Sequence, residues 1–217
     1  MLNELLARFG TNLYFIPAAL ICITVHEFSH GWAAYKLGDD TAKNMGRLSL
    51  NPIRHMDLIG FLMMVLVGFG WAKPVPVNPG RFENPKRDMA ITALAGPLSN
   101  FILAFLCLII YAILAVFTPE NRVTNVIVLL FFYTAVLSIN LGVFNLVPVP
   151  PLDGSKVLSV FLPDRIYASL LRYERYGMIL LIILLYSGVL SRPLAFAREG
   201  ILEFFLNIIG AVVNVFS

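Results

Sequence analysis

The stretch Met89–Thr118, MAITALAGPLSNFILAFLCLIIYAILAVFT, runs for 30 residues without a formal charge. A second uncharged run of 30 residues, Val123–Leu152, follows almost at once. A helix needs about 20 predominantly apolar residues to cross the hydrocarbon core of a bilayer. Each run is therefore long enough for one spanning helix, and together they place the centre of the chain in a membrane.

The flanking sequence has the same character. Between Arg8 and Lys36 the only formal charge is Glu27, so this run predicts a third span, and the uncharged runs Tyr176–Ser191 and Phe204–Ser217 predict two more. The 15 residues Leu58–Ala72 are too short to cross a bilayer. We expect an all-α polytopic membrane protein with about five transmembrane helices and a short re-entrant or β-hairpin segment.

The composition excludes several classes of protein. The chain is 59% hydrophobic and only 13% charged, whereas soluble domains carry about 25% charged residues. This excludes a soluble globular protein, a disordered chain and a nucleic-acid binder. Both cysteines, Cys22 and Cys107, lie inside apolar runs, which excludes a disulfide framework. No internal repeat is visible, and we expect residues 1–217 to form a single membrane-embedded domain.

The basic residues predict how the chain is oriented. If residues 1–11 face outward, 12 of the 16 lysines and arginines fall on the inner side. The positive-inside rule then places the loops 38–57, 71–88 and 154–175 in the cytosol. This count assumes that residues 58–72 enter and leave on the same side. If they crossed fully, the later loops would change sides and the excess of basic residues on one side would nearly disappear. The charge distribution therefore favours a re-entrant segment.

The first predicted span contains the sequence His26-Glu27-Phe28-Ser29-His30. Residues four apart share a helix face, so both imidazoles can reach one metal ion, and Glu27 lies beside them, where it can accept a proton from water. Zinc takes imidazole and carboxylate ligands and keeps a position open for a water of lowered pKa. Ionisable groups inside a span are candidates for function by default. A polar cluster that holds helices together, or a proton relay, is the alternative.

A catalytic zinc site of this kind needs a third protein ligand. The candidates on the same predicted side are His55, Asp57, Asp88 and Asp153. Asp153 follows Asn145-Leu-Val-Pro-Val-Pro-Pro-Leu, in which three prolines require the backbone to unwind at membrane depth. Irregular backbone is tolerated there only if it is buried in protein or lines a wet cavity, which suits a metal ligand. An interfacial aspartate that caps the next helix is the alternative.

Together, these motifs resemble the site-2 protease family of intramembrane zinc metalloproteases, in a minimal form without a PDZ or CBS domain. Two more segments are similar to elements of that family. Gly96-Pro97-Leu98-Ser99-Asn100 resembles its Gly-Pro-x-x-Asn element, and residues 68–77 resemble the hairpin after its first catalytic helix. The resemblance covers a catalytic core of about residues 12–162 and leaves the accessory C-terminal helices, about 174–217, unexplained.

The resemblance implies a role for each matching residue. His26, His30 and Asp153 would bind one zinc ion per chain, and Glu27 would be the general base and then the acid that protonates the leaving amine. Asn145 matches a polar residue near the metal and is a candidate donor to the developing oxyanion. It is equally a candidate for satisfying backbone groups freed by the prolines.

The resemblance also implies the function. We expect hydrolysis of peptide bonds within or near transmembrane segments of membrane-protein substrates. The partners would be a transmembrane protein substrate and the lipid bilayer, and the chain would be a multi-pass protein of a bacterial plasma membrane with its active site toward the cytosol. The alternatives are a catalytically silent scaffold and a metal or proton transporter. The presence of Glu27 argues against the first, and the confinement of ionisable residues to one place argues against the second.

The segment Gly70–Asn78 alternates like a strand, with prolines at positions 74 and 76 that suit an exposed edge. We expect it to hold the unwound substrate by strand addition, with Trp71, Lys73, Val75 and Val77 as contact residues. A simple interfacial loop is the alternative. Trp71 also fits an aromatic anchor at the membrane edge.

Two polar residues have open roles. His55 is a candidate alternative ligand, a partner of a ligand or a gate, and an ordinary interfacial histidine is the alternative. Asn100 is expected to pack or hydrogen-bond between helices beside Gly96 rather than to take part in the chemistry. Cys22 lies one turn before His26, where an unpaired thiol usually serves packing.

Overall fold

The computed structural model describes the backbone of residues 2–67, 70–119 and 121–216, with side chains for 14–64, 70–119, 121–163, 165–166 and 176–211. The elements in chain order are α1 (Leu2–Lys36), α2 (Thr41–Asn44), η1 (Pro52–Arg54), α3 (Leu58–Val67), η2 (Pro79–Arg81), α4 (Pro85–Phe117), α5 (Arg122–Asn145), α6 (Asp153–Ser159), α7 (Asp164–Tyr186) and α8 (Ser191–Phe216). The described residues contain no β-strand, which confirms the all-α prediction.

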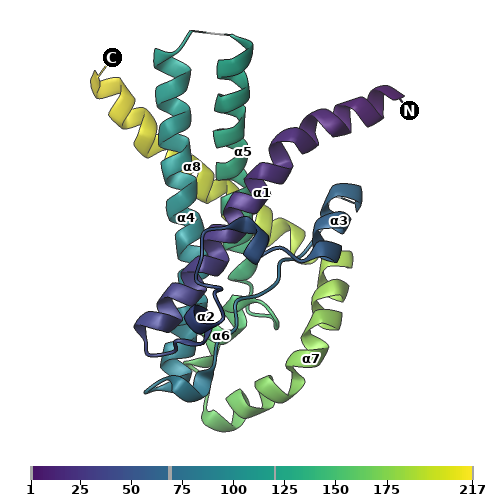
Figure 1. The fold of residues 1–217 in the computed structure, drawn as a ribbon, viewed down its shortest axis with the longest axis vertical. Helices are drawn as coiled ribbons and strands as arrows, with labels where there is room; N and C mark the ends of the chain where they lie inside the picture. The colour runs from purple at the N-terminus through teal and green to yellow at the C-terminus, as the bar shows by residue number, and fades with distance from the viewer. Residues whose placement is uncertain (1, 68–69, 120, 217) are drawn as a thin grey trace.

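The two long uncharged runs form α4 and α5, which lie side by side as a helical hairpin (Figure 1). Each helix begins at an asparagine whose side chain accepts a backbone N–H of the first turn: Asn84 from Arg87 at 3.2 Å, and Asn121 from Thr124 at 2.9 Å. These caps satisfy donors that have no partner within the helix. α4 therefore begins four residues before its uncharged run, and α5 begins one residue before its own.

The hairpin and α8 share one apolar core. Its buried members are Ala104, Cys107 and Leu108 of α4, Ala135, Ile139 and Val143 of α5, and Ile209 of α8. Small side chains in this core let the helix backbones approach closely, which is how helices pack within a membrane. α8 crosses the hairpin obliquely (Figure 1), and the rings of Phe105 and Phe205 meet at a centroid distance of 5.2 Å.

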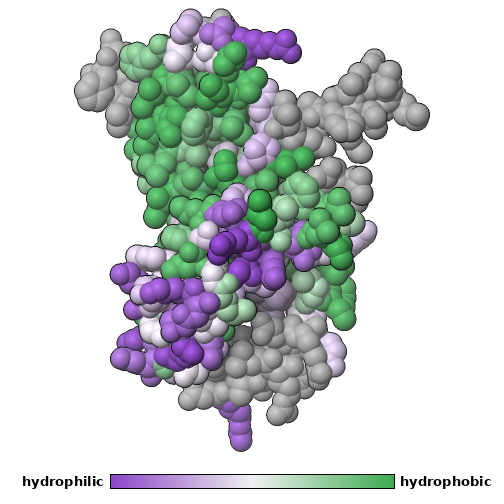
Figure 2. Space-filling model, in the orientation of Figure 1, coloured by the Kyte–Doolittle hydropathy of each residue, from purple (hydrophilic) through white to green (hydrophobic). Residues whose placement is uncertain are grey.

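The outer surface of the hairpin is apolar. Figure 2 shows a hydrophobic face along α4 and α5, bounded by hydrophilic residues at the α4–α5 connection and around α2. Both helices have the length and hydropathy of membrane spans. Exposed large apolar residues on them, such as Ile102, Val116 and Val126, are the side chains that a bilayer would cover.

The predicted total of about five spans is not confirmed. Of the residues that the structure describes, α4 and α5 satisfy the requirements for a span, and a bent pair supplies a third if it counts as one. This pair, Tyr176–Tyr186 of α7 and Ser191–Ala211 of α8, is bent by 83° at the short break between the helices. Apolar run length alone predicted two C-terminal spans because it carries no information about such a bend.

α1 crosses the hairpin and packs against both α4 and α5 (Figure 1). After α1, residues 37–57 form a loop containing α2 and η1. α3 has 10 residues, which corresponds to about 15 Å, half the thickness of the hydrocarbon core. This helix is therefore too short to cross.

The ends of the α3 segment meet. Met56 and Ala72 form an isolated antiparallel bridge, and the Lys73 N–H donates to the His55 carbonyl at 2.9 Å. The chain thus returns beside the point from which it left. The predicted β-hairpin is not confirmed, because this single bridge is the only strand-like pairing between described residues here. Two of the predicted hairpin residues, Gly68 and Phe69, lie outside the described part of the chain.

Candidate active site

α1 presents two imidazoles on one face, as the four-residue spacing requires. The Nε2 atoms of His26 and His30 lie 3.0 Å apart, and the two rings are nearly perpendicular, at 89°. Both residues are buried, with relative exposures of 5% and 9%. Both rings therefore direct their Nε2 atoms at a single point between α1 and the neighbouring elements.

Asp153 reaches this point from a distant part of the chain. α5 ends at Asn145, the proline-rich residues 146–152 form turns without a helix, and α6 begins at Asp153. A side chain at Gly154 would collide with the Leu146 carbonyl, so glycine allows α6 to start directly against the end of α5. The carboxylate does not cap α6, since no side-chain capping bond is present and the N-cap residue is Leu152. Asp153 Oδ2 instead lies 3.2 Å from His26 Nε2 and 3.1 Å from His30 Nε2.

These three atoms have the spacing of metal ligands. Zinc–nitrogen distances of about 2.0–2.1 Å in a tetrahedral site place the ligand atoms about 3.3 Å from one another, close to the 3.0–3.2 Å observed. In the described part of the chain this is the one group of three or more histidine, cysteine or acidic side chains whose ligand atoms lie within 4.8 Å of one another. Two imidazole nitrogens and a carboxylate oxygen are a donor set that zinc takes, so these residues fit the ion.

α4 holds His30 in the state needed for binding a cation. His30 Nδ1 lies 2.7 Å from the buried Thr92 carbonyl. Because a carbonyl can only accept, Nδ1 carries the proton, and in the neutral ring Nε2 keeps its lone pair for a metal. Such a partner on the far nitrogen fixes the tautomer and the ring orientation of a ligand histidine.

Gly96 of α4 makes the close approach of the two helices possible. A Cβ atom at this position would lie 2.5 Å from Cε1 and Nε2 of His30 and 2.7 Å from Cε1 of His26. No side chain fits there without displacing the rings. The sequence indicated only that Gly96 is a small residue beside Asn100, and did not predict its contact with the histidines. The Gly-Pro-x-x-Asn element was the signal that this part of α4 contributes to the site.

Glu27 lies beside the histidine pair and is not a member of the ligand group. Its Oε2 accepts a hydrogen bond from the Val75 backbone N–H at 2.7 Å. The carboxylate lines a cleft of about 330 Å³ together with the three ligand residues. A base in this place has access to a water near the metal ligands, as the spacing of the motif predicts.

The same cleft contains other residues singled out from the sequence. Asn145, Val75 and Val77 line it, as do Pro74 and Lys156. Asn145 Nδ2 donates to the Leu141 carbonyl at 3.0 Å. This intrahelical bond uses one Nδ2 hydrogen and leaves the second for another partner.

The remaining candidate ligands are engaged elsewhere. Asp57 accepts the Gly60 N–H at 2.8 Å and so caps the start of α3. Asp88 pairs with Arg87 at 2.7 Å and accepts the Asn84 N–H at 3.0 Å. His55 Nε2 donates to the Ser49 carbonyl at 2.6 Å. Of the four candidates, Asp153 alone joins the histidine pair.

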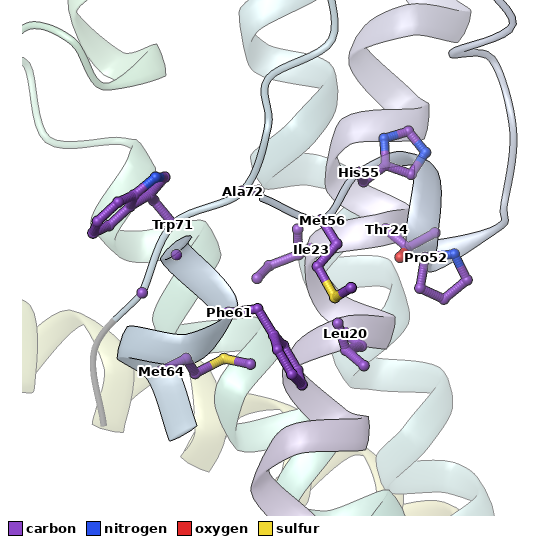
Figure 3. Close-up of a pocket in the computed structure, with 12 residues that line it drawn as sticks. Leu20, Ile23, Thr24, Pro52, His55, Met56, Phe61, Met64, Trp71 and Ala72 are labelled. Atoms are coloured by element: carbon purple, nitrogen blue, oxygen red, sulfur yellow. The ribbon is translucent and has the colours of Figure 1, made fainter. Parts of the chain in front are cut away.

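His55 and Trp71 line a different cavity. Figure 3 shows His55, Thr24 and Met56 around a pocket between α1 and the α3 segment. Trp71 lies at its rim, with its indole directed away from Leu20 and half exposed. Lys73 is exposed near the cleft, and Asn100 is fully buried one turn beyond Gly96. None of these four side chains is among the cleft-lining residues.

Comparison with known proteins gives an independent result. A family model described as peptidase family M50 matches residues 14–123 and 112–188. The Bacillus subtilis (strain 168) protein named "Putative zinc metalloprotease YwhC" is 37% identical over 198 residues, which cover 88% of this chain and 90% of that protein. Rip2 of Mycolicibacterium smegmatis, which carries the same zinc metalloprotease designation, is 28% identical over 197 residues, covering 86% of this chain and 72% of Rip2. No solved structure matches the chain.

The matched ranges contain His26, His30, Asp153 and Glu27. The chain belongs to peptidase family M50, the site-2 protease family.

Proposed function

We propose that this chain is a zinc-dependent endopeptidase that hydrolyses peptide bonds within or beside transmembrane segments of other membrane proteins. The observation that carries the proposal is the convergence of His26, His30 and Asp153 next to Glu27 in one cleft. A scaffold that only bound metal would not need a proton acceptor beside the ligands. A transporter would need polar groups along a path through the chain rather than one closed cluster.

The residues of the cleft suit peptide hydrolysis. Zinc held by the three ligands would supply a Lewis acid for the scissile carbonyl and would lower the pKa of a water. Glu27 takes a proton from the attacking water as the new C–O bond forms, and returns it to the amide nitrogen as the C–N bond breaks. Asn145 lines the same cleft, and its second Nδ2 hydrogen is available to the developing oxyanion.

The proposed substrate explains why a strand-like segment borders the cleft. A transmembrane helix satisfies its own backbone groups, so its peptide bonds become accessible only when it unwinds and finds other hydrogen-bond partners. Pro74, Val75 and Val77 lie on the cleft wall. An extended peptide that donates its N–H groups to backbone carbonyls of this segment would gain such partners while its scissile bond lies beside Glu27.

The proposed location follows from the same arrangement. The cleft is lined by the end of α1, the segment after α3 and the start of α6, and hydrophilic residues around α2 lie on this end of the molecule (Figure 2). The positive-inside rule assigns the loops 38–57, 71–88 and 154–175 to the cytosol. We therefore place the active site on the cytosolic side of the plasma membrane, where water enters from the polar end.

The test compares the wild-type chain with the Glu27→Gln variant in proteoliposomes. The substrate is a library of labelled transmembrane peptides, and the products are identified by mass spectrometry while bound metal is measured in parallel. We expect Glu27→Gln to keep one zinc per chain and to lose essentially all cleavage. Near-native cleavage by Glu27→Gln would show that the base is another group. Several weak, exchangeable metal ions per chain would instead favour transport.

A further inference from the structure

The sequence Pro74-Val75-Pro76 contains one backbone N–H, because proline has none. That N–H, on Val75, donates to Glu27 Oε2 at 2.7 Å. The prolines at alternate positions therefore leave the Val75 N–H as the single backbone donor in this stretch. It is directed at the Glu27 carboxylate.

The segment that carries Val75 is anchored on both sides. On one side, the Lys73 N–H donates to the His55 carbonyl at 2.9 Å, and Arg47 Nη2 donates to the Lys73 carbonyl at 2.7 Å. On the other side, the Asn78 N–H donates to Asp39 Oδ2 at 2.6 Å. Asp39 is fully buried, so the second anchor is shielded from water. These bonds fix the position of the backbone between them.

The Val75 side chain fixes the approach to α1. It is 8% exposed, and its Cγ1 would lie 3.1 Å from a Cβ atom at Gly31, the residue that follows His30. The side chain thus fills the space that Gly31 leaves on the helix. Packing and hydrogen bonding together hold the Val75 amide at the level of Glu27.

We propose that the Val75 N–H positions the Glu27 carboxylate for catalysis, and that the flanking prolines allow only this register; the inference rests on the proposed protease function. A slip of the segment by one residue in either direction would bring a proline nitrogen opposite Glu27, which cannot donate. With Oε2 held by Val75, the second oxygen of Glu27 is the one that takes the proton from water. Val75 is thus a positioning residue that acts through its backbone.

The sharpest test replaces only the amide. Incorporation of α-hydroxyvaline at position 75 by nonsense suppression converts the N–H to an ester oxygen and keeps the side chain. The control is valine inserted by the same route. We expect kcat to fall by about 10- to 100-fold, the size of effect that a misplaced reacting group causes, with KM and zinc affinity unchanged. An ester protein with the kcat of the valine control would overturn the inference.

The same ester substitution in the Glu27→Asp variant distinguishes an effect on the position of Glu27 from a general effect on the fold. In Glu27→Asp, the shorter carboxylate no longer reaches Val75, so the ester should lower kcat by less than threefold there. An equal loss in both backgrounds would mean that the ester acts on the fold rather than through Glu27.

A spectroscopic measurement makes the test independent of turnover. In protein labelled with 15N-valine, the Val75 amide proton should resonate downfield because its acceptor is charged, and it should move upfield in Glu27→Gln. An unchanged Val75 resonance would refute the contact even if the chain proved to have no protease activity. If the Val75 resonance shows the expected downfield position and its change in Glu27→Gln, but the wild-type chain cleaves no substrate, the proposed function is refuted and the contact stands.

Discussion

Substitution of Gly96 by alanine tests whether α4 determines the metal site. The new Cβ atom would lie 2.5 Å from His30 Cε1 and Nε2, whereas non-bonded carbon atoms pack at about 3.5–4.0 Å. The imidazoles, or α4 itself, must therefore retreat by about 1 Å. Metal–ligand distances tolerate changes of only about 0.2 Å. The two histidines and Asp153 can then no longer hold one ion with undistorted geometry.

The expected loss is about 30-fold in zinc affinity, or about 2 kcal/mol, since each factor of ten corresponds to about 1.4 kcal/mol. This lies within the range for losing the support of a metal ligand. Affinity would be measured in detergent by competition with a chromophoric chelator. Gly200→Ala in α8 is the matched control, because a Cβ atom there meets no atom within 4 Å. A Gly96→Ala protein that binds zinc within twofold of the wild type, as Gly200→Ala should, would refute the reasoning.

Three further outcomes are expected. Asp153→Ala should reduce bound zinc far below one per chain, and retention of stoichiometric zinc would show that Asp153 is not a ligand. Replacement of residues 71–77 by a Gly/Ser linker should abolish cleavage while zinc content is preserved, because the substrate edge and the Val75 amide are both lost; unchanged cleavage would reject strand addition. A cysteine in place of the exposed Lys43, added to the two buried cysteines, should react with a membrane-impermeant maleimide only after the cytosolic face is opened, and labelling of intact cells would reverse the proposed orientation.

The three residues that converge in the cleft could be predicted because each depends on a local rule. The four-residue spacing of His26 and His30 fixes their common face on any helix. The prolines favoured Asp153 among four candidates, because irregular backbone at membrane depth is a sign of a site, and the resemblance to the site-2 protease family implied that it is the third ligand. Neither inference requires knowledge of the tertiary contacts, and both name the residues that converge in the structure.

The supporting residues could not be predicted in the same way. The contact of Gly96 with both imidazoles and the bond from the His30 ring to the Thr92 carbonyl depend on how α4 packs against α1. The bond between Glu27 and Val75 joins residues 48 positions apart. Sequence periodicity describes one helix or strand at a time, so it identifies the polar groups and leaves their partners open.

The span count illustrates a different limit. Hydropathy measures how long an apolar run is, and on that basis α4 and α5 were predicted. It does not register an 83° bend between α7 and α8, so it counts these two runs as separate spans. Run length did indicate that residues 58–72 are too short to cross, but the Met56–Ala72 bridge that closes this segment depends on tertiary packing.

X-ray absorption at the zinc edge, combined with metal analysis of the purified chain, tests the central claim most directly. We expect one zinc per chain with a first shell of nitrogen and oxygen atoms at about 2.0–2.1 Å, and with the scattering pattern of two imidazoles. A sulfur scatterer at about 2.3 Å would assign the metal to a cysteine instead. That result, or the absence of stoichiometric zinc, would contradict a centre built from His26, His30 and Asp153.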